Sequence, residues 1–285
     1  MTEKYNASNI SLDQILSYIK SGEIAIPEIQ RPFVWKPRQV RDLIDSLYKG
    51  YPTGYLIISQ SPDMKLKDGS LSLGKKIMID GQQRVTALMT AIAGLEVLTN
   101  DFKKRRIKIA FNPQASEENE EEIFKVQDNA ILRDKRWIAD VANLFKPDFD
   151  QWAFVNEYCQ QNPEVNGSQM NRILMRLLDI KNRQIGVITL NKDLNIDEVT
   201  DIFIRINSQG AKLNQADFAM SKIAANTEYG GNALRKAIDY FSHLAVEPDW
   251  YNEMAQDTLF METSYASRLK WLKDDRASIF DPDYN

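Results

Sequence analysis

The sequence predicts a mixed α/β (α+β) fold that carries a helical insertion and ends in a helical part. Short apolar runs of strand length alternate with helical periodicity at the start of the chain, residues 137–180 show helical periodicity only, and a strand-like run returns at 185–190. Because strands that alternate with helices form a sheet covered by helices, the first part should be a mixed-sheet core. The expected division is a core at residues 1–115, a helical insertion at 116–182, a strand and helix rejoining the core at 183–213, and a helical C-terminal part at 214–285.

Capping and breaking residues place the elements along the chain. Ser11 and Gln14 form the S-x-x-Q signal of a helix N-terminus, and Gly22 follows where that helix can end. The remaining core elements are, in order, an extended segment at 23–29, a helix from Pro37 to Gly50, strands at 55–58 and 77–79, a helix from Gly81 to Gly94 and a strand at 107–111. Later elements are helices around 152–158 and 170–178, the strand at 185–190, a helix at 196–206 and further helices from Asn214 onward.

Composition and charge exclude several classes of protein. The residues are 43% hydrophobic and 27% charged, and no apolar run suits a membrane span or a signal peptide, so we expect a soluble cytoplasmic protein without membrane contact. Cys159 is the single cysteine and His243 the single histidine, which excludes a disulfide scaffold, most zinc sites and a His-Asn-His nuclease centre within these residues. The net charge of −4 argues against chain-wide attraction to nucleic acid.

The stretch with the clearest chemical signal is the DGQQR motif, Asp80-Gly81-Gln82-Gln83-Arg84, between an apolar strand and a helix. Asp80 and Gln83 fit a capping pair, and Gly81 allows a sharp turn. Such a turn points unpaired N–H groups and the positive end of the helix dipole at one spot, where Arg84 adds a forked cation. These features outline a phosphate site. The structural alternative is that Asp80 only caps a buried helix and the polar side chains are solvated.

Four segments occur together in this order: residues 26–35 (IPEIQRPFVW), 79–84 (IDGQQR), 203–210 (FIRINSQG) and 213–217 (LNQAD). Their combination resembles the N-terminal domain family of GmrSD-type, modification-dependent restriction proteins, from about Ile10 to about Ile223. The resemblance implies a ParB/sulfiredoxin-like fold, in which a comparable strand–turn–helix holds nucleotide phosphates. It also implies a role in defence against phage and foreign DNA, in which nucleotide binding and hydrolysis control a nuclease.

The resemblance also assigns roles to individual residues. The nucleotide-binding set would be Gln30, Arg31, Gly81, Gln82, Gln83, Arg84, Asn207 and Gly210. In the catalytic set, Asp80 would hold Mg²⁺, Arg84 would neutralise developing charge on the nucleoside triphosphate together with Arg31, and Gln83 or Gln82 would orient the attacking water. The structural alternatives are that Arg31 is only an ion-pair partner and that Asn207 is only a helix C-cap. We expect Arg31 and Arg84 to lie close together, and Phe33 and Trp35 to pack in the core.

Three functions stay open at the level of sequence. The chain could be a Mg²⁺-dependent nucleoside triphosphatase, a sensor of nucleotide or modified DNA without chemistry, or, less favoured by its acidic balance, a ParB-like nuclease. In many family members the nuclease is a separate C-terminal His-Asn-His domain, which this chain lacks, so a fragment, a regulatory subunit and a stand-alone form are all open. The expected partners are nucleotide, DNA reached through a larger assembly, and a nuclease domain or subunit outside this chain; a homodimer is left open.

Overall fold

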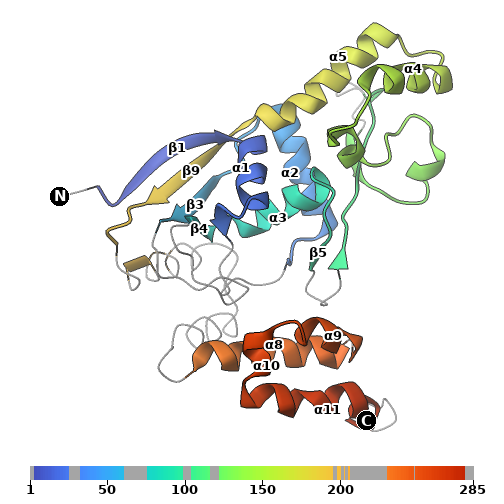
Figure 1. The fold of residues 1–285 in the computed structure, drawn as a ribbon. Helices are drawn as coiled ribbons and strands as arrows, with labels where there is room; N and C mark the ends of the chain where they lie inside the picture. Colours follow the sequence, from blue (N-terminus) through green and yellow to red (C-terminus); the bar gives the residue numbers. More distant parts are fainter. Residues whose placement is uncertain are drawn as a thin grey trace.

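A mixed five-stranded sheet forms the centre of the computed structural model (Figure 1). Its strands are β1 (Tyr5–Ser11), β2 (Ile24–Ala25), β3 (Tyr55–Ser59), β4 (Lys76–Asp80) and β9 (Gln184–Leu190), in the order β1-β9-β3-β4-β2. The pairs β1–β9 and β3–β4 are antiparallel, whereas β9–β3 and β4–β2 are parallel. The structure describes residues 3–25, 33–60, 76–98, 104–115, 122–194, 198–199, 202, 205, 230–246 and 248–279.

The strands at the centre of the sheet are apolar on both faces. On one face lie α1 (Leu12–Lys20), α2 (Pro37–Lys49) and α3 (Gln82–Ala91), whose apolar residues share the main core with Leu56, Ile58 and Met78 (Figure 1). On the other face, Ile57 and Ile79 belong to a second, smaller cluster together with Leu190, Leu194 and Val199. Because successive strand residues point to opposite faces, burial on both faces explains the continuous apolar runs of β3 and β4.

Capping determines where the first helices begin and end. The Ser11 side chain accepts a hydrogen bond from the Gln14 N–H at 3.3 Å, which confirms the start expected for α1. Pro37 occupies the first turn of α2, and Gly50 ends this helix with φ of 76°. The strand before α1 is a finding that the sequence pattern does not predict. β1 is an edge strand with five exposed residues and no apolar alternation, so it is defined by pairing with β9.

Two small sheets and a helical hairpin lie between β4 and β9. The sheets pair β5 (Val97–Leu98) with β6 (Lys104–Arg105), and β7 (Ile109–Phe111) with β8 (Phe124–Val126). The hairpin consists of α4 (Gln151–Gln161) and α5 (Gly167–Leu178), and the 3-10 helices are η2 (Ile131–Arg133), η3 (Val141–Phe145) and η4 (Asp179–Asn182). The rings of Tyr48, Phe111 and Phe124 pack at centroid distances of 5.1 to 5.6 Å and join the β7–β8 hairpin to α2.

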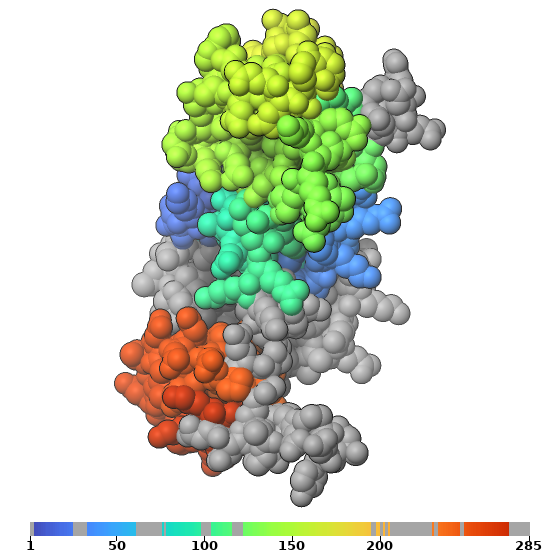
Figure 2. All heavy atoms as spheres, turned by 90° about the vertical axis from the view of Figure 1, so that its right-hand side faces the viewer, coloured from blue at the N-terminus to red at the C-terminus, as the bar shows by residue number. Residues whose placement is uncertain are grey.

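The C-terminal helices have a core of their own. They are α8 (Gly231–Val246), η5 (Pro248–Trp250), α9 (Tyr251–Met254), α10 (Thr258–Met261) and α11 (Ser264–Ile279). Their shared cluster includes Leu244, Met254, Phe260 and Leu272. Figure 2 shows α4 and α5 at one end of the molecule and the C-terminal helices at the other.

These elements confirm the mixed α/β class and the return of the strand at 185–190 to the first sheet. The ParB/sulfiredoxin-like details and the four domain boundaries stay predictions. None of the described helices combines the length and the apolar composition that crossing a membrane requires.

Candidate functional site

The turn from β4 to α3 strongly favours glycine at position 81. Asp80 ends β4, Gly81 is the N-cap residue and Gln82 begins α3. Gly81 has φ of 100°, and a Cβ atom there would overlap Cδ2 of Leu56. Both the left-handed backbone and the missing space therefore disfavour a side chain. Within the described residues no side chain caps the first turn of α3.

The carboxylate of Asp80 binds Arg84 instead of the helix N-terminus. Nη2 of Arg84 donates to Oδ2 of Asp80 at 3.1 Å, and Oε1 of Gln83 accepts a hydrogen bond from the Val34 N–H at 2.9 Å. The predicted capping pair of Asp80 and Gln83 is therefore wrong, because Gly81 takes the N-cap position and both side chains are engaged elsewhere. The bond from Val34 ties the chain that follows the IPEIQRPF segment to the first turn of α3.

A second contact fixes the Arg84 guanidinium from the segment just before β3. Nη1 of Arg84 donates to the carbonyl oxygen of Thr53 at 3.0 Å. A Cβ on Gly54, which has φ of 83°, would lie 2.8 Å from the same nitrogen, so glycine leaves the room that the guanidinium uses. Thr53 and Gly54 meet Arg84 because β3 is antiparallel to β4, which places the start of β3 beside the end of β4. The sequence shows only a Pro-Thr-Gly turn signal here, and nothing links it to Arg84.

Burial and charge act in opposite directions on Arg84. Desolvation lowers the pKa of the guanidinium, and the nearby Asp80 carboxylate raises it. The net direction is downward, but arginine starts so high that the group stays charged at neutral pH. Its side chain is 20% exposed and that of Asp80 is 30% exposed. Two of the five N–H donors of Arg84 bind acceptors among the described residues, and within that part of the chain the others remain for an external anion.

The other predicted site residues divide into described and undescribed ones. Gln82 is 9% exposed, so its side chain is mostly buried, and Gln83 is half-buried. Phe33 is buried and Trp35 packs against the main core, as expected. Gln30, Arg31, Asn207 and Gly210 lie outside the described residues, so the closeness of Arg31 and Arg84 stays a prediction.

Asp80 suits a metal ion that is shared with a ligand. Among the described residues, no group of three His, Cys, Asp or Glu side chains could hold a metal ion. Mg²⁺ is usually held through one or two carboxylates together with substrate phosphates. Within the described part, Oδ1 of Asp80 makes no hydrogen bond, whereas Oδ2 binds Arg84. Among the described residues, Asp80 could therefore contribute one carboxylate ligand to Mg²⁺, and the other ligands would have to come from elsewhere.

Comparisons with known proteins identify the family of the chain. The model of the GmrSD restriction endonuclease N-terminal domain matches residues 12–224, about three quarters of the chain. A protein of Methanocaldococcus jannaschii described as uncharacterized is 22% identical over 233 residues, covering 70% of this chain and 39% of that protein. The chain thus spans less than half the length of that relative. The matched residues include four strands of the central sheet and the β4–α3 turn. The chain belongs to the family of GmrSD restriction endonuclease N-terminal domains and is thereby related to restriction systems.

Proposed function

We propose that the protein binds a nucleoside triphosphate at the β4–α3 turn and hydrolyses it to control a DNA-cleaving partner in an anti-phage restriction system. The observation that carries this proposal is the position of Arg84. Asp80 and Thr53 hold its guanidinium beside the first turn of α3, where Gly81 contributes no capping side chain. A fixed cation beside an uncapped helix N-terminus is a favourable place for phosphate.

Binding of the nucleotide would use backbone and side-chain donors together. The first-turn N–H groups and the remaining donors of Arg84 would hold phosphate oxygens. Arg31 would supply a second cation, and chain connectivity supports this role. Val34, which binds Gln83, follows Arg31 by three residues, and three residues span at most about 11 Å. Gln30, Asn207 and Gly210 complete the set that the family resemblance suggests.

Hydrolysis would need an oriented water and charge neutralisation. The Asp80 carboxylate would hold Mg²⁺ directly or through water, and the ion would supply positive charge that offsets the charge of the phosphates. Arg84 would stabilise the charge that develops during transfer of the phosphoryl group. The side-chain amide of Gln83 lies in the first turn of α3 and would orient the attacking water, with Gln82 as the alternative.

A non-catalytic sensor of nucleotide or modified DNA is the second candidate. The ion pair between Asp80 and Arg84 favours it, since the carboxylate already orients the arginine and need not hold a metal ion. In either case the DNA, which can carry a modification, and the nuclease domain or subunit would join from outside this chain. The site of action would be the cytoplasm, and a homodimer would be one form of the assembly.

The test measures two quantities in the presence of Mg²⁺, for the wild type and three variants. Calorimetry measures nucleotide binding, and phosphate release measures hydrolysis. Arg84→Gln should weaken binding by about tenfold or more, because it removes charge-assisted bonds to phosphate. Asp80→Ala should abolish phosphate release. The control is Arg133→Gln at an exposed position of η2, which should change neither quantity. Failure of the folded wild type to bind any nucleoside triphosphate would overturn the proposal. Binding without phosphate release, even with DNA and a nuclease partner present, would establish the sensor.

A further inference from the structure

A cavity of about 200 Å³ lies away from the β4–α3 turn, between α2, the loop after β7 and α5. Its apolar lining includes Tyr48, Phe111, Pro113 and Ile173. Two polar side chains, Asn112 and Arg176, also line it. The cavity is therefore an apolar pocket with polar groups at two places, which is the usual form of a small-molecule site.

Arg176 supplies the charged group of this cavity. Its guanidinium carbon lies 4.4 Å from the centre of the Tyr48 ring, which is a cation–π distance. The residue is exposed on α5, and in the described part of the chain no carboxylate forms an ion pair with it. Stacking on the ring limits the motion of the guanidinium and leaves its N–H edges for an external acceptor.

Asn112 supplies a donor from a mostly buried residue. The residue is only 5% exposed, and its Oδ1 accepts a hydrogen bond from the Gln114 N–H at 3.0 Å. Because only the oxygen of the amide can accept that bond, the orientation of the side chain is fixed. Its Nδ2 group donates no hydrogen bond to any of the described residues. An N–H group that bonds no acceptor among the described residues is available to a ligand oxygen in the cavity.

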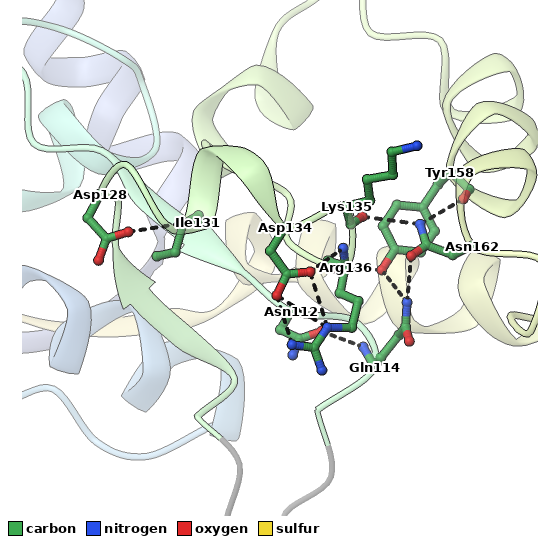
Figure 3. Close-up of polar contacts among 9 residues, drawn as sticks. All are labelled: Asn112, Gln114, Asp128, Ile131, Asp134, Lys135, Arg136, Tyr158 and Asn162. Atoms are coloured by element: carbon green, nitrogen blue, oxygen red, sulfur yellow. Dashed lines mark hydrogen bonds and ion pairs between the residues drawn. The ribbon is translucent and has the colours of Figure 1, made fainter.

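The loop that carries Asn112 is held in place before any ligand arrives. Figure 3 shows that Gln114 reaches α4, where its Nε2 donates to the Tyr158 hydroxyl at 3.1 Å and to Oδ1 of Asn162 at 3.0 Å. The Tyr158 hydroxyl in turn donates to the carbonyl oxygen of Arg136 at 2.7 Å. The backbone N–H of Asn112 donates to the Ile123 carbonyl at 2.9 Å. Because this wall of the cavity is already fixed, the protein loses little conformational entropy when a ligand binds there.

Size and donor chemistry together define the ligand. A cavity of this volume is smaller than sites for drug-sized molecules, which are roughly 300–1,000 Å³, but larger than an apolar cavity of about 150 Å³ that holds benzene. One ring with a small substituent therefore fits. The polar groups offer N–H donors from a cation and an amide, which match an oxyanion. We propose that this cavity binds a single-ring aromatic or heteroaromatic carboxylate, with the ring among the apolar side chains and the carboxylate between Asn112 and Arg176.

Such a ligand would contact α2 in the sheet core and α5 in the helical hairpin at the same time. It would therefore stabilise their packing, whether or not the β4–α3 turn binds a nucleotide. The inference is independent of the proposed function.

The experiment titrates the ¹⁵N-labelled full chain with benzoate and nicotinate and follows amide shifts and melting temperature. Benzamide and uracil, which have a ring but no carboxylate, test the requirement for charge. Acetate, which has a carboxylate but no ring, tests the requirement for the ring. We expect saturable shifts around Asn112 and a higher melting temperature with the ring carboxylates only. Arg176→Gln should weaken their binding about tenfold, because it removes a charge-assisted bond. Arg172→Gln, one turn earlier on the exposed side of α5, is the matched control and should leave binding unchanged.

Three results would overturn the inference. The first is the lack of saturable binding by either ring carboxylate. The second is equal binding of benzamide or uracil that Arg176→Gln does not weaken, which would show that the carboxylate is not recognised. The third is equal binding of acetate, which would show that the ring is not recognised. Asn112→Ala serves as a second variant where it folds, and it should also weaken binding of the ring carboxylates.

Discussion

At the scale of single residues, the DGQQR motif shows what a sequence can and cannot specify. The sharp turn at Gly81 was predictable, because glycine is strongly favoured in this turn between an apolar strand and a helix. The partners of Asp80 and Gln83 were not predictable from spacing. A carboxylate three residues before a glutamine fits a capping pair, yet Arg84 lies one helical turn from Asp80 and offers a stronger, charged partner.

The strain at Gly81 leads to a stability prediction. Gly81→Ala should lower the free energy of unfolding by about 2–4 kcal/mol, since it adds left-handed backbone strain and a clash with Leu56. Urea denaturation monitored by circular dichroism measures the change. Gly167→Ala is the control, because a Cβ there would come no closer than 3.9 Å to Cys159 Sγ and the position lies in the first turn of α5. We expect an effect within about 1 kcal/mol for that variant. Equal losses in both variants would contradict the structural account of the turn.

At the scale of elements, periodicity and capping located the helices better than the strands. Ser11 and Pro37 mark the starts of α1 and α2. The edge strand β1 has no apolar alternation, and its existence depends on β9, nearly 180 residues later. The strand expected at 107–111 appears as β7, but its partner is β8, a pairing that the sequence pattern does not indicate. Local patterns report local geometry, whereas strand pairing is set by distant parts of the chain.

The polar contacts between the β7–β8 region and α4 yield a pH-dependent prediction. Burial raises the pKa of the Tyr158 hydroxyl to about 12, although the hydrogen bond from Gln114 acts to lower it. The hydroxyl therefore ionises more readily in the unfolded chain, where its pKa is about 10. Its contribution to stability is fully present below about pH 10 and is lost as the pH rises through about 12.

Comparison with Tyr158→Phe isolates this contribution. The variant should lose about 1–3 kcal/mol of stability at neutral pH, because Gln114 and the Arg136 carbonyl lose a hydrogen-bond partner. Between pH 10 and 12 the difference between wild type and variant should shrink. Equilibrium denaturation across that range provides the measurement, and the difference between the two proteins removes the titration of other tyrosines and lysines. A difference that is constant with pH would show that Tyr158 does not titrate as the structure indicates.

At the scale of the whole molecule, the described residues form clusters that share no members. The main cluster joins the sheet to the helices before it and to the α4–α5 hairpin, whereas Leu244, Phe260 and Leu272 belong to a cluster of the C-terminal helices. The sequence predicted helices in this last part, but a helical pattern alone does not tell whether an apolar face packs on the sheet or on neighbouring helices. Separate cores generally unfold as separate cooperative units.

This separation predicts two calorimetric transitions that respond to different substitutions. Leu272→Ala removes a fully buried side chain from α11 and should destabilise the C-terminal unit by about 2–5 kcal/mol while leaving the transition of the sheet in place. Leu88→Ala, in the main cluster on α3, should instead destabilise the unit that contains the sheet and leave the C-terminal transition in place. Differential scanning calorimetry of the full chain measures both transitions. Each variant serves as the control for the other, since both replace a buried helical leucine by alanine. A single transition that both substitutions shift equally would show that the two clusters unfold as one unit.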